Sequence, residues 1–165
     1  NQYGLSTQVP NVVSVYNTRF SGRRTFGNVS FDLIKVPQGL LVGIQARPLT
    51  EGGETPFPTL ARTLFDALYD WSRFNLFSEA LERVVGEAKR DAKFTRELIR
   101  IACNCGNIGT VRRIGYVLEV RAGISSTRLA ALIAAVPETK SLVPFIPMKL
   151  AKWKINKRGG IIEYE

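Results

Sequence analysis

Histidine is absent from this 165-residue chain, and cysteine occurs only twice. Without histidine the chain cannot build a Ser-His-Asp triad, a Cys-His nucleophile pair or a His-rich metal site. A structural zinc site usually takes four Cys or His ligands, so Cys103 and Cys105 alone cannot form one. Their spacing of two residues suits a mutual disulfide poorly, and so few thiols indicate a reducing, cytoplasmic compartment.

Long apolar runs and a leader sequence are also missing. No run reaches the roughly 18 to 20 residues that cross a bilayer, because Pro137 ends the run that begins at Leu129. Residues 1–7 have neither the charged region nor the apolar region of a signal peptide. We therefore expect a soluble protein without membrane contact. Because the first residue is Asn1 rather than methionine, we interpret the chain as part of a longer protein.

The acidic residues leave one catalytic alternative open, a metal-dependent nuclease. Asp66, Asp70 and the pair Glu87 and Lys89 are the residue types that hold a divalent ion and the attacked phosphate. On a helix, however, Glu87 and Lys89 point about 200 degrees apart and cannot meet at one metal-bound water. We favour a protein that is not an enzyme and needs no cofactor or metal. The expected alternative is surface ion pairs, Arg62 with Asp66 and Glu79 with Arg83.

Positive charge is the most informative feature that is present. Twenty-three Lys and Arg oppose 14 Asp and Glu, and the formal net charge of +9 favours an anionic partner. We expect contacts to phosphate or to an acidic protein rather than to bases, because the chain has no recognition helix or RNP-like aromatic motif. The cations gather in clusters, which we predict to form a surface that binds nucleic acid or a partner protein: Arg19, Arg23, Arg24, Lys93, Arg96, Arg100, Arg112, Arg113, Lys149, Lys152, Lys154, Lys157 and Arg158.

Short segments rich in β-branched and aromatic residues occupy the N-terminal third. Residues 12–16, 29–36 and 40–48 are of this kind and are separated by turn-forming glycine and proline, which predicts a small antiparallel meander. Within the second segment Val29, Phe31 and Leu33 alternate with polar residues, so one face of that strand is expected to pack inward.

Helical periodicity begins at Thr59, where Leu60, Leu64 and Leu68 recur on one face. Beyond Pro147 the pattern becomes extended again, which predicts a terminal hairpin that rejoins the sheet. Strands followed by helices and then strands are typical of an α+β domain. We expect one such domain over residues 1–165, with the meander and the hairpin packed against four or five helices. The later helices are expected to be capped by Ser78, Asp91, Asn107 and Ser125 or Ser126, and Gly106 to end one of them in the left-handed conformation.

Three segments carry a family resemblance. They are Gly4-Leu5-Ser6-Thr7-Gln8-Val9-Pro10 with the strand that follows it, Leu60-Ala61-Arg62-Thr63-Leu64-Phe65-Asp66-Ala67-Leu68, and Val111-Arg112-Arg113-Ile114-Gly115-Tyr116-Val117-Leu118-Glu119. In this order, over roughly residues 3 to 121, they resemble the C-terminal domain of the AbiEi family of type IV toxin-antitoxin regulators. Ala61 departs from the family, whose members often have an acidic residue at that position.

The resemblance implies a division of labour. A winged helix upstream of this chain would read operator DNA, and the present domain would neutralise a nucleotidyltransferase-like toxin and support autoregulation. A stand-alone domain that binds nucleic acid without a toxin partner remains a further alternative. Read from the residues alone, the matching segments have structural explanations, since Leu60, Leu64 and Leu68 have core spacing and Gly115 could let a neighbouring element approach its helix closely.

Overall fold

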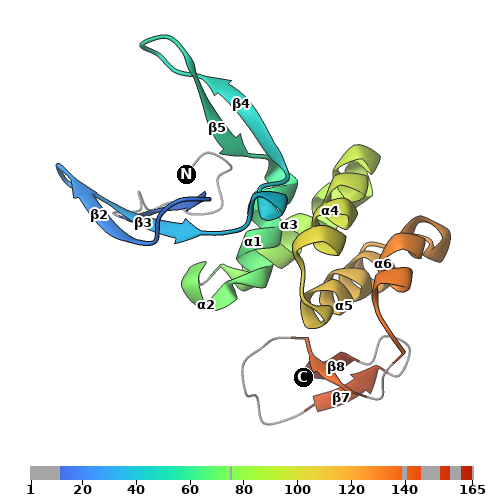
Figure 1. The fold of residues 1–165 in the computed structure, drawn as a ribbon. Helices are drawn as coiled ribbons and strands as arrows, with labels where there is room; N and C mark the ends of the chain where they lie inside the picture. The colour runs from blue at the N-terminus through green and yellow to red at the C-terminus, as the bar shows by residue number, and fades with distance from the viewer. Residues whose placement is uncertain (1–11, 75, 139–140, 146–152, 157–160, 165) are drawn as a thin grey trace.

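The computed structural model describes residues 12–74, 76–138, 141–145, 153–156 and 161–164, and its fold belongs to the α+β class, as predicted. Figure 1 shows two β-hairpins that extend from one end of a group of helices and a small sheet near the other end. The described strands form three separate sheets, ordered β1-β3-β2, β4-β5 and β6-β8-β7. Their bounds are β1 Val12–Asn17, β2 Gly22–Phe26, β3 Val29–Lys35, β4 Ile44–Pro48, β5 Glu54–Pro58, β6 Val143–Pro144, β7 Trp153–Asn156 and β8 Ile161–Tyr164.

The first sheet differs from the expected meander, because β1 pairs with β3 in parallel rather than with β2. Residues 18–21 carry the chain across the end of β3 to its far side, where β2 begins. The side-chain oxygen of Asn17 accepts the N–H groups of Arg19 at 2.9 Å and Phe20 at 2.7 Å, and the Val36 N–H donates to the Asn17 carbonyl at 2.8 Å. These bonds stabilise residues 18–21 in the crossing. A tight turn between β1 and β2 would instead place the two strands side by side.

The second hairpin, β4–β5, has an edge that proline protects. The Thr59 N–H donates to the Gly43 carbonyl and the Leu49 N–H donates to the Gly53 carbonyl, which fixes the ladder at both ends. In that register the backbone of Pro56 and Pro58 faces away from β4. The prolines therefore remove no ladder bond, and they leave the outer edge of β5 with few donors for another strand.

The helices follow the sequence prediction more closely. Asp91 and Asn107 cap α4 and α5 through side-chain bonds, as predicted, and Thr59 caps α1 in the same way. The Ser78 cap is wrong, because α3 begins at Phe77, whose ring lies against Phe145 with 6.3 Å between ring centroids. The bounds are α1 Leu60–Tyr69, α2 Trp71–Phe74, α3 Phe77–Arg90, α4 Ala92–Cys105, α5 Ile108–Tyr116, a π-helical turn Val117–Arg121, and α6 Ala130–Ala135, with 3-10 turns at Gln38–Leu40 and Ser126–Leu129.

Gly106 and Gly115 have roles other than those predicted. The backbone of Gly106 is extended, with φ −77° and ψ 143°, and not left-handed, because the chain passes directly into α5. A Cβ atom at Gly106 would lie 2.5 Å from the Ala102 carbonyl oxygen, so close approach requires the glycine there. At Gly115 a Cβ atom would meet no described residue outside its own helix within 4 Å, so no described element packs closely against it.

This contrast gives a prediction about stability. Gly115→Ala should raise the free energy of unfolding by about 0.5 to 1 kcal/mol, because alanine loses less backbone entropy in a helix interior and the added methyl has room. Gly106→Ala should lower the free energy of unfolding instead. Urea denaturation of both variants measures the two changes, and a destabilised Gly115→Ala protein would contradict the described packing.

The helices share one core in which α4 is central. α4 contacts α1, α3, α5 and α6, and its inward face buries Phe94, Leu98 and Ile101. Ile161 of β8 belongs to the same core. The terminal hairpin of β7 and β8 pairs with β6, so the prediction that it rejoins the N-terminal sheet is wrong. The core therefore fixes which face of α4 points outward.

Candidate nucleic-acid interface

The outer face of α4 carries three of the predicted binding residues. Lys93, Arg96 and Arg100 are all exposed, at positions i, i+3 and i+7 of the helix. That spacing places three side chains along one side of a helix. Because the opposite side of α4 is buried in the core, the helix cannot rotate these cations away from solvent. We call Lys93, Arg96 and Arg100 the α4 basic face.

The α4 basic face keeps its charge unpaired within the described part of the chain. Glu97, which could neutralise Lys93 or Arg100 by helical pairing, instead accepts a hydrogen bond from the Thr59 hydroxyl at 2.9 Å. Among the described residues the side chains of Lys93, Arg96 and Arg100 make no ion pair and no hydrogen bond. Three neighbouring cations are therefore available to an external anion.

A second group of predicted residues lies on the hairpin formed by β2 and β3, which we call the β2–β3 arm (Gly22–Lys35). Arg23 is paired with Asp32 across the two strands at 2.8 Å, and this pairing lowers the pKa of the partly exposed Asp32 carboxyl. Arg24 is exposed and donates to the Arg23 carbonyl at 3.1 Å. Arg19 is exposed at the base of the arm. The β2–β3 arm and its base thus carry one neutralised arginine, Arg23, and two uncompensated ones, Arg24 and Arg19.

The remaining predicted residues fall at the C-terminal side of the fold. Arg112 donates to the Ser141 carbonyl at 2.7 Å, and half-buried Arg113 donates to the Pro144 carbonyl at 2.8 Å. Burial lowers the pKa of Arg113. Both side chains therefore hold the β6 segment against α5. Lys154 lies in β7 opposite Glu163 in register. Four predicted residues lie outside the described part of the chain: Lys149, Lys152, Lys157 and Arg158.

The predicted residues are not gathered into one continuous surface. Figure 1 shows the β2–β3 arm extending to one side of α1 and α4 lying on the other side. The arm and its base also expose two aromatic side chains that the charge pattern did not indicate, Phe26 at 69% and Phe20 at 59% exposure. A phenylalanine directly before the Gly27-Asn28 turn is the sequence signal for an aromatic residue at a hairpin tip.

A buried polar network joins the hairpins to the helices. The Arg62 and Asp66 pair forms as predicted, but it is buried rather than on the surface, with Arg62 7% exposed. The same guanidinium donates to the Leu40 carbonyl at 2.6 Å and the Val42 carbonyl at 3.1 Å, so it ties the connection before β4 to α1. Burial raises the pKa of the Asp66 carboxyl, and the bonds from Arg62 oppose that rise.

Tyr16 of β1 lies beside this network and gives a prediction about pH. Its ring is 5.6 Å from the Arg62 guanidinium, and burial with the Asp66 and Asp70 carboxylates raises its pKa from 10.0 to about 12. Between these pH values the unfolded state loses a proton that the folded state keeps. The stabilisation from neutral Tyr16 is therefore present below pH 10 and is lost as pH rises toward 12.

The test compares the wild type with Tyr16→Phe. We expect the wild type to lose more stability than the variant between pH 10 and pH 12, measured by denaturant unfolding. The difference in phenolate absorbance between the two folded proteins should titrate with a midpoint near 12. A midpoint at the ordinary tyrosine value of 10.0 would show that Tyr16 is not held in this environment.

The carboxylates that the nuclease alternative would use have structural partners: Arg62 for Asp66, Arg73 for Asp70, and two arginines for Glu87. Glu87 pairs with both Arg83 and Arg90 at 2.8 Å, so the predicted pair of Glu79 with Arg83 is wrong, and Asp70 pairs with Arg73. Glu87 lies one helical turn after Arg83 and one turn before Arg90, so both side chains reach it. Within the described residues no group of three or more His, Cys, Asp or Glu is placed to hold a metal ion.

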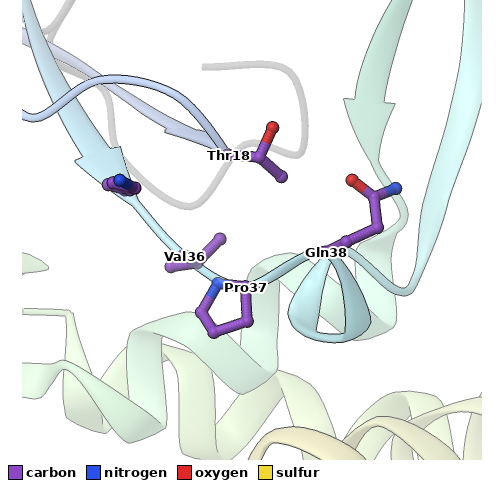
Figure 2. Close-up of a pocket in the computed structure, with 5 residues that line it drawn as sticks. Thr18, Val36, Pro37 and Gln38 are labelled. Carbon is purple, nitrogen blue, oxygen red and sulfur yellow. The ribbon is translucent and has the colours of Figure 1, made fainter.

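An open hollow lies at the base of the β2–β3 arm. Thr18 and Gln38 flank it, Val36 and Pro37 lie beneath them, and Lys35 completes the lining, as Figure 2 shows. Among the described residues the lining offers one cation and two neutral polar side chains, with neither a carboxylate nor a thiol. Such a set can contact an anion, but it does not provide a nucleophile with an adjacent base.

Comparisons with known proteins give no match. No protein-family model, no curated protein and no solved structure matches this chain. In the part of the chain that the structure describes, no helix combines the length and apolar character needed to cross a membrane. A functional proposal therefore rests on the geometry above and on the sequence resemblance.

Proposed function

We propose that this chain is the non-catalytic domain of a cytoplasmic AbiEi-like antitoxin and transcriptional regulator, and that it binds duplex DNA through the α4 basic face. One observation carries the DNA-binding part: Lys93, Arg96 and Arg100 are exposed together, and the carboxylate among them is bound to Thr59. Lys and Arg side chains that neutralise phosphates supply most of the sequence-independent affinity for DNA. The α4 basic face would position the domain on the backbone, while an upstream winged helix would read the operator.

The antitoxin part of the proposal is supported by the resemblance of three sequence segments. Two of these segments make contacts that stabilise the fold, as expected of segments that define a domain family. Arg62 and Asp66 of the second segment form the buried network, and Arg112 and Arg113 of the third hold residues 141–145. Co-expression with a nucleotidyltransferase-like toxin encoded beside the gene tests this part. Restored growth would support antitoxin activity, and unchanged toxicity would favour a stand-alone nucleic-acid-binding domain.

The DNA-binding part is tested by fluorescence anisotropy with a short labelled duplex. We expect affinity to fall steeply as salt rises from about 50 to 200 mM, because bound phosphates release counterions. A chain that binds no duplex at low salt would contradict the proposal. The metal-dependent nuclease is tested in the same samples, since cleavage of the duplex with magnesium or manganese, lost in Asp66→Ala or Glu87→Ala, would favour it.

A further inference from the structure

The two faces of the β2–β3 arm differ sharply in charge. Residues paired across an antiparallel ladder share a face, so Arg23 and Thr25 lie with Asp32 and Ser30. This face is neutral overall, because Arg23 and Asp32 form an ion pair and the Thr25 and Ser30 hydroxyls lie 3.3 Å apart. The polar groups of this face are therefore satisfied within the arm.

The other face combines an uncompensated arginine with aromatic rings. Arg24 lies with Phe31, and Phe26 lies with Val29, on the side of the arm away from Asp32. The Phe26 and Phe31 rings meet edge to face with 5.8 Å between centroids, and Phe26 is still 69% exposed. We call Arg24, Phe26, Val29 and Phe31 the aromatic face of the arm. No carboxylate lies on it.

The aromatic face is held in place rather than flexibly tethered. β1 pairs with residues 30–35 of β3, and Asn17 fixes the crossing at the base of the arm through its bonds to Arg19 and Phe20. Seven strand residues at about 3.3 Å each separate this base from the tip, which makes the arm roughly 20 Å long. A second exposed arginine and phenylalanine, Arg19 and Phe20, lie at the base.

We infer that the β2–β3 arm enters a groove of duplex DNA, with Phe26 against the bases at one step and Arg24 on a neighbouring phosphate. The arm is one edge of the three-stranded sheet β1-β3-β2, and strands of such sheets enter DNA grooves, where apolar side chains insert between base steps. The unpaired guanidinium beside the ring supplies the complementary charge for phosphate. A protein partner fits less well, because binding energy between proteins concentrates in desolvated centres, whereas β2, the edge strand of this sheet, is exposed along its whole length.

This inference rests on the proposed DNA binding but concerns a different part of the fold. The α4 basic face and the arm lie on different sides of α1, so they would contact separate stretches of DNA (Figure 1). The α4 basic face offers charge alone, whereas the arm adds an aromatic contact to bases. The domain would therefore contribute to the choice of binding site in addition to affinity.

The test uses the full 165-residue chain and short duplexes in which 2-aminopurine replaces one base at successive positions. We expect the wild type to change the fluorescence of the probe at one step, because a ring at that step alters its stacking. Phe26→Ala should abolish this change and weaken binding about tenfold, since one stacked base contributes ~1 to 3 kcal/mol. The salt dependence of binding by Phe26→Ala should equal that of the wild type, and Phe26→Tyr should restore both the fluorescence change and the affinity. Arg24→Gln should instead lower the slope of log K against log salt by about one.

Leu49→Ala is the matched control, because Leu49 is also an exposed apolar residue, at 50%, and lies at the end of β4 in the other hairpin. If Leu49→Ala binds like the wild type and Phe26→Ala does not, the arm is the contact. If the wild type binds duplex and the α4 variants lose binding, but Phe26→Ala binds within twofold of the wild type, the arm inference fails alone. A wild type that binds no duplex overturns the proposed function and the arm contact together.

Discussion

Reversing two charges of the α4 basic face, as Arg96→Glu with Arg100→Glu, is expected to raise the Kd for duplex DNA at least about 30-fold at low salt. The reason is that two exposed cations without a described ion-pair partner become two anions that repel phosphate. Anisotropy titrations with one labelled duplex measure the change. Circular dichroism should show that the variant folds, since both side chains point away from the core.

A matched control separates this local effect from the total charge. Arg83→Glu with Arg128→Glu changes two exposed arginines elsewhere, and each double variant lowers the formal net charge from +9 by four. The control should bind DNA with only the small loss that a lower overall charge causes. Equal losses in the two variants would show that net charge, and not the α4 basic face, determines binding.

Arg62→Met is expected to lower the free energy of unfolding by about 3 to 5 kcal/mol, the largest stability effect of a single change here. The substitution leaves the Asp66 carboxylate buried without its partner, and it removes the donor to the Leu40 and Val42 carbonyls. Thermal and urea unfolding measure the loss. The exposed Arg90, paired with Glu87, gives the control, since Arg90→Met should change stability by about 1 kcal/mol or less.

A double variant tests the mechanism of that loss. Arg62→Met with Asp66→Leu removes both charges, so it should recover part of the stability that Arg62→Met alone loses. Recovery should be incomplete because the two backbone carbonyls still lack their donor. A double variant that is less stable than Arg62→Met would show that the buried Asp66 charge is not the source of the loss.

The sequence predicts most helices because their signals are local. Thr59, Asp91 and Asn107 each accept a hydrogen bond from a backbone N–H two or three residues later, so the cap can be read from a few neighbouring residues. The α+β class follows from the change of hydrophobic period at Thr59. Gly43 shows the limit of this reading, because its φ of 72° and the close Ile101 side chain become visible only in the folded chain.

The strands were harder to predict because a segment becomes a strand by pairing with another segment, which its own residues do not specify. Gly22–Phe26 has no apolar alternation and is exposed throughout, so it becomes β2 only by pairing with β3. The parallel order of β1 and β3 depends on a crossing that no local pattern encodes. Likewise the C-terminal hairpin pairs with β6, a two-residue strand held by Arg113 across 31 residues.

Only the part of the candidate site that depends on local sequence could be predicted. Helical spacing alone places Lys93, Arg96 and Arg100 on one face, and the structure describes them there. Their availability depends on the contact from Glu97 to Thr59, 38 residues away, which the sequence does not reveal. Arg112 and Arg113 looked equivalent to the α4 cations in the sequence, but both donate to backbone carbonyls of residues 141–145.

The salt dependence of duplex binding tests the central claim most directly, compared between the wild type and Lys93→Gln with Arg96→Gln and Arg100→Gln. If the α4 basic face contacts phosphates, the slope of log K against log salt should be smaller in the variant by about 2 to 3. An unchanged slope with unchanged affinity would contradict the proposed interface, because the three cations would then neutralise no phosphate.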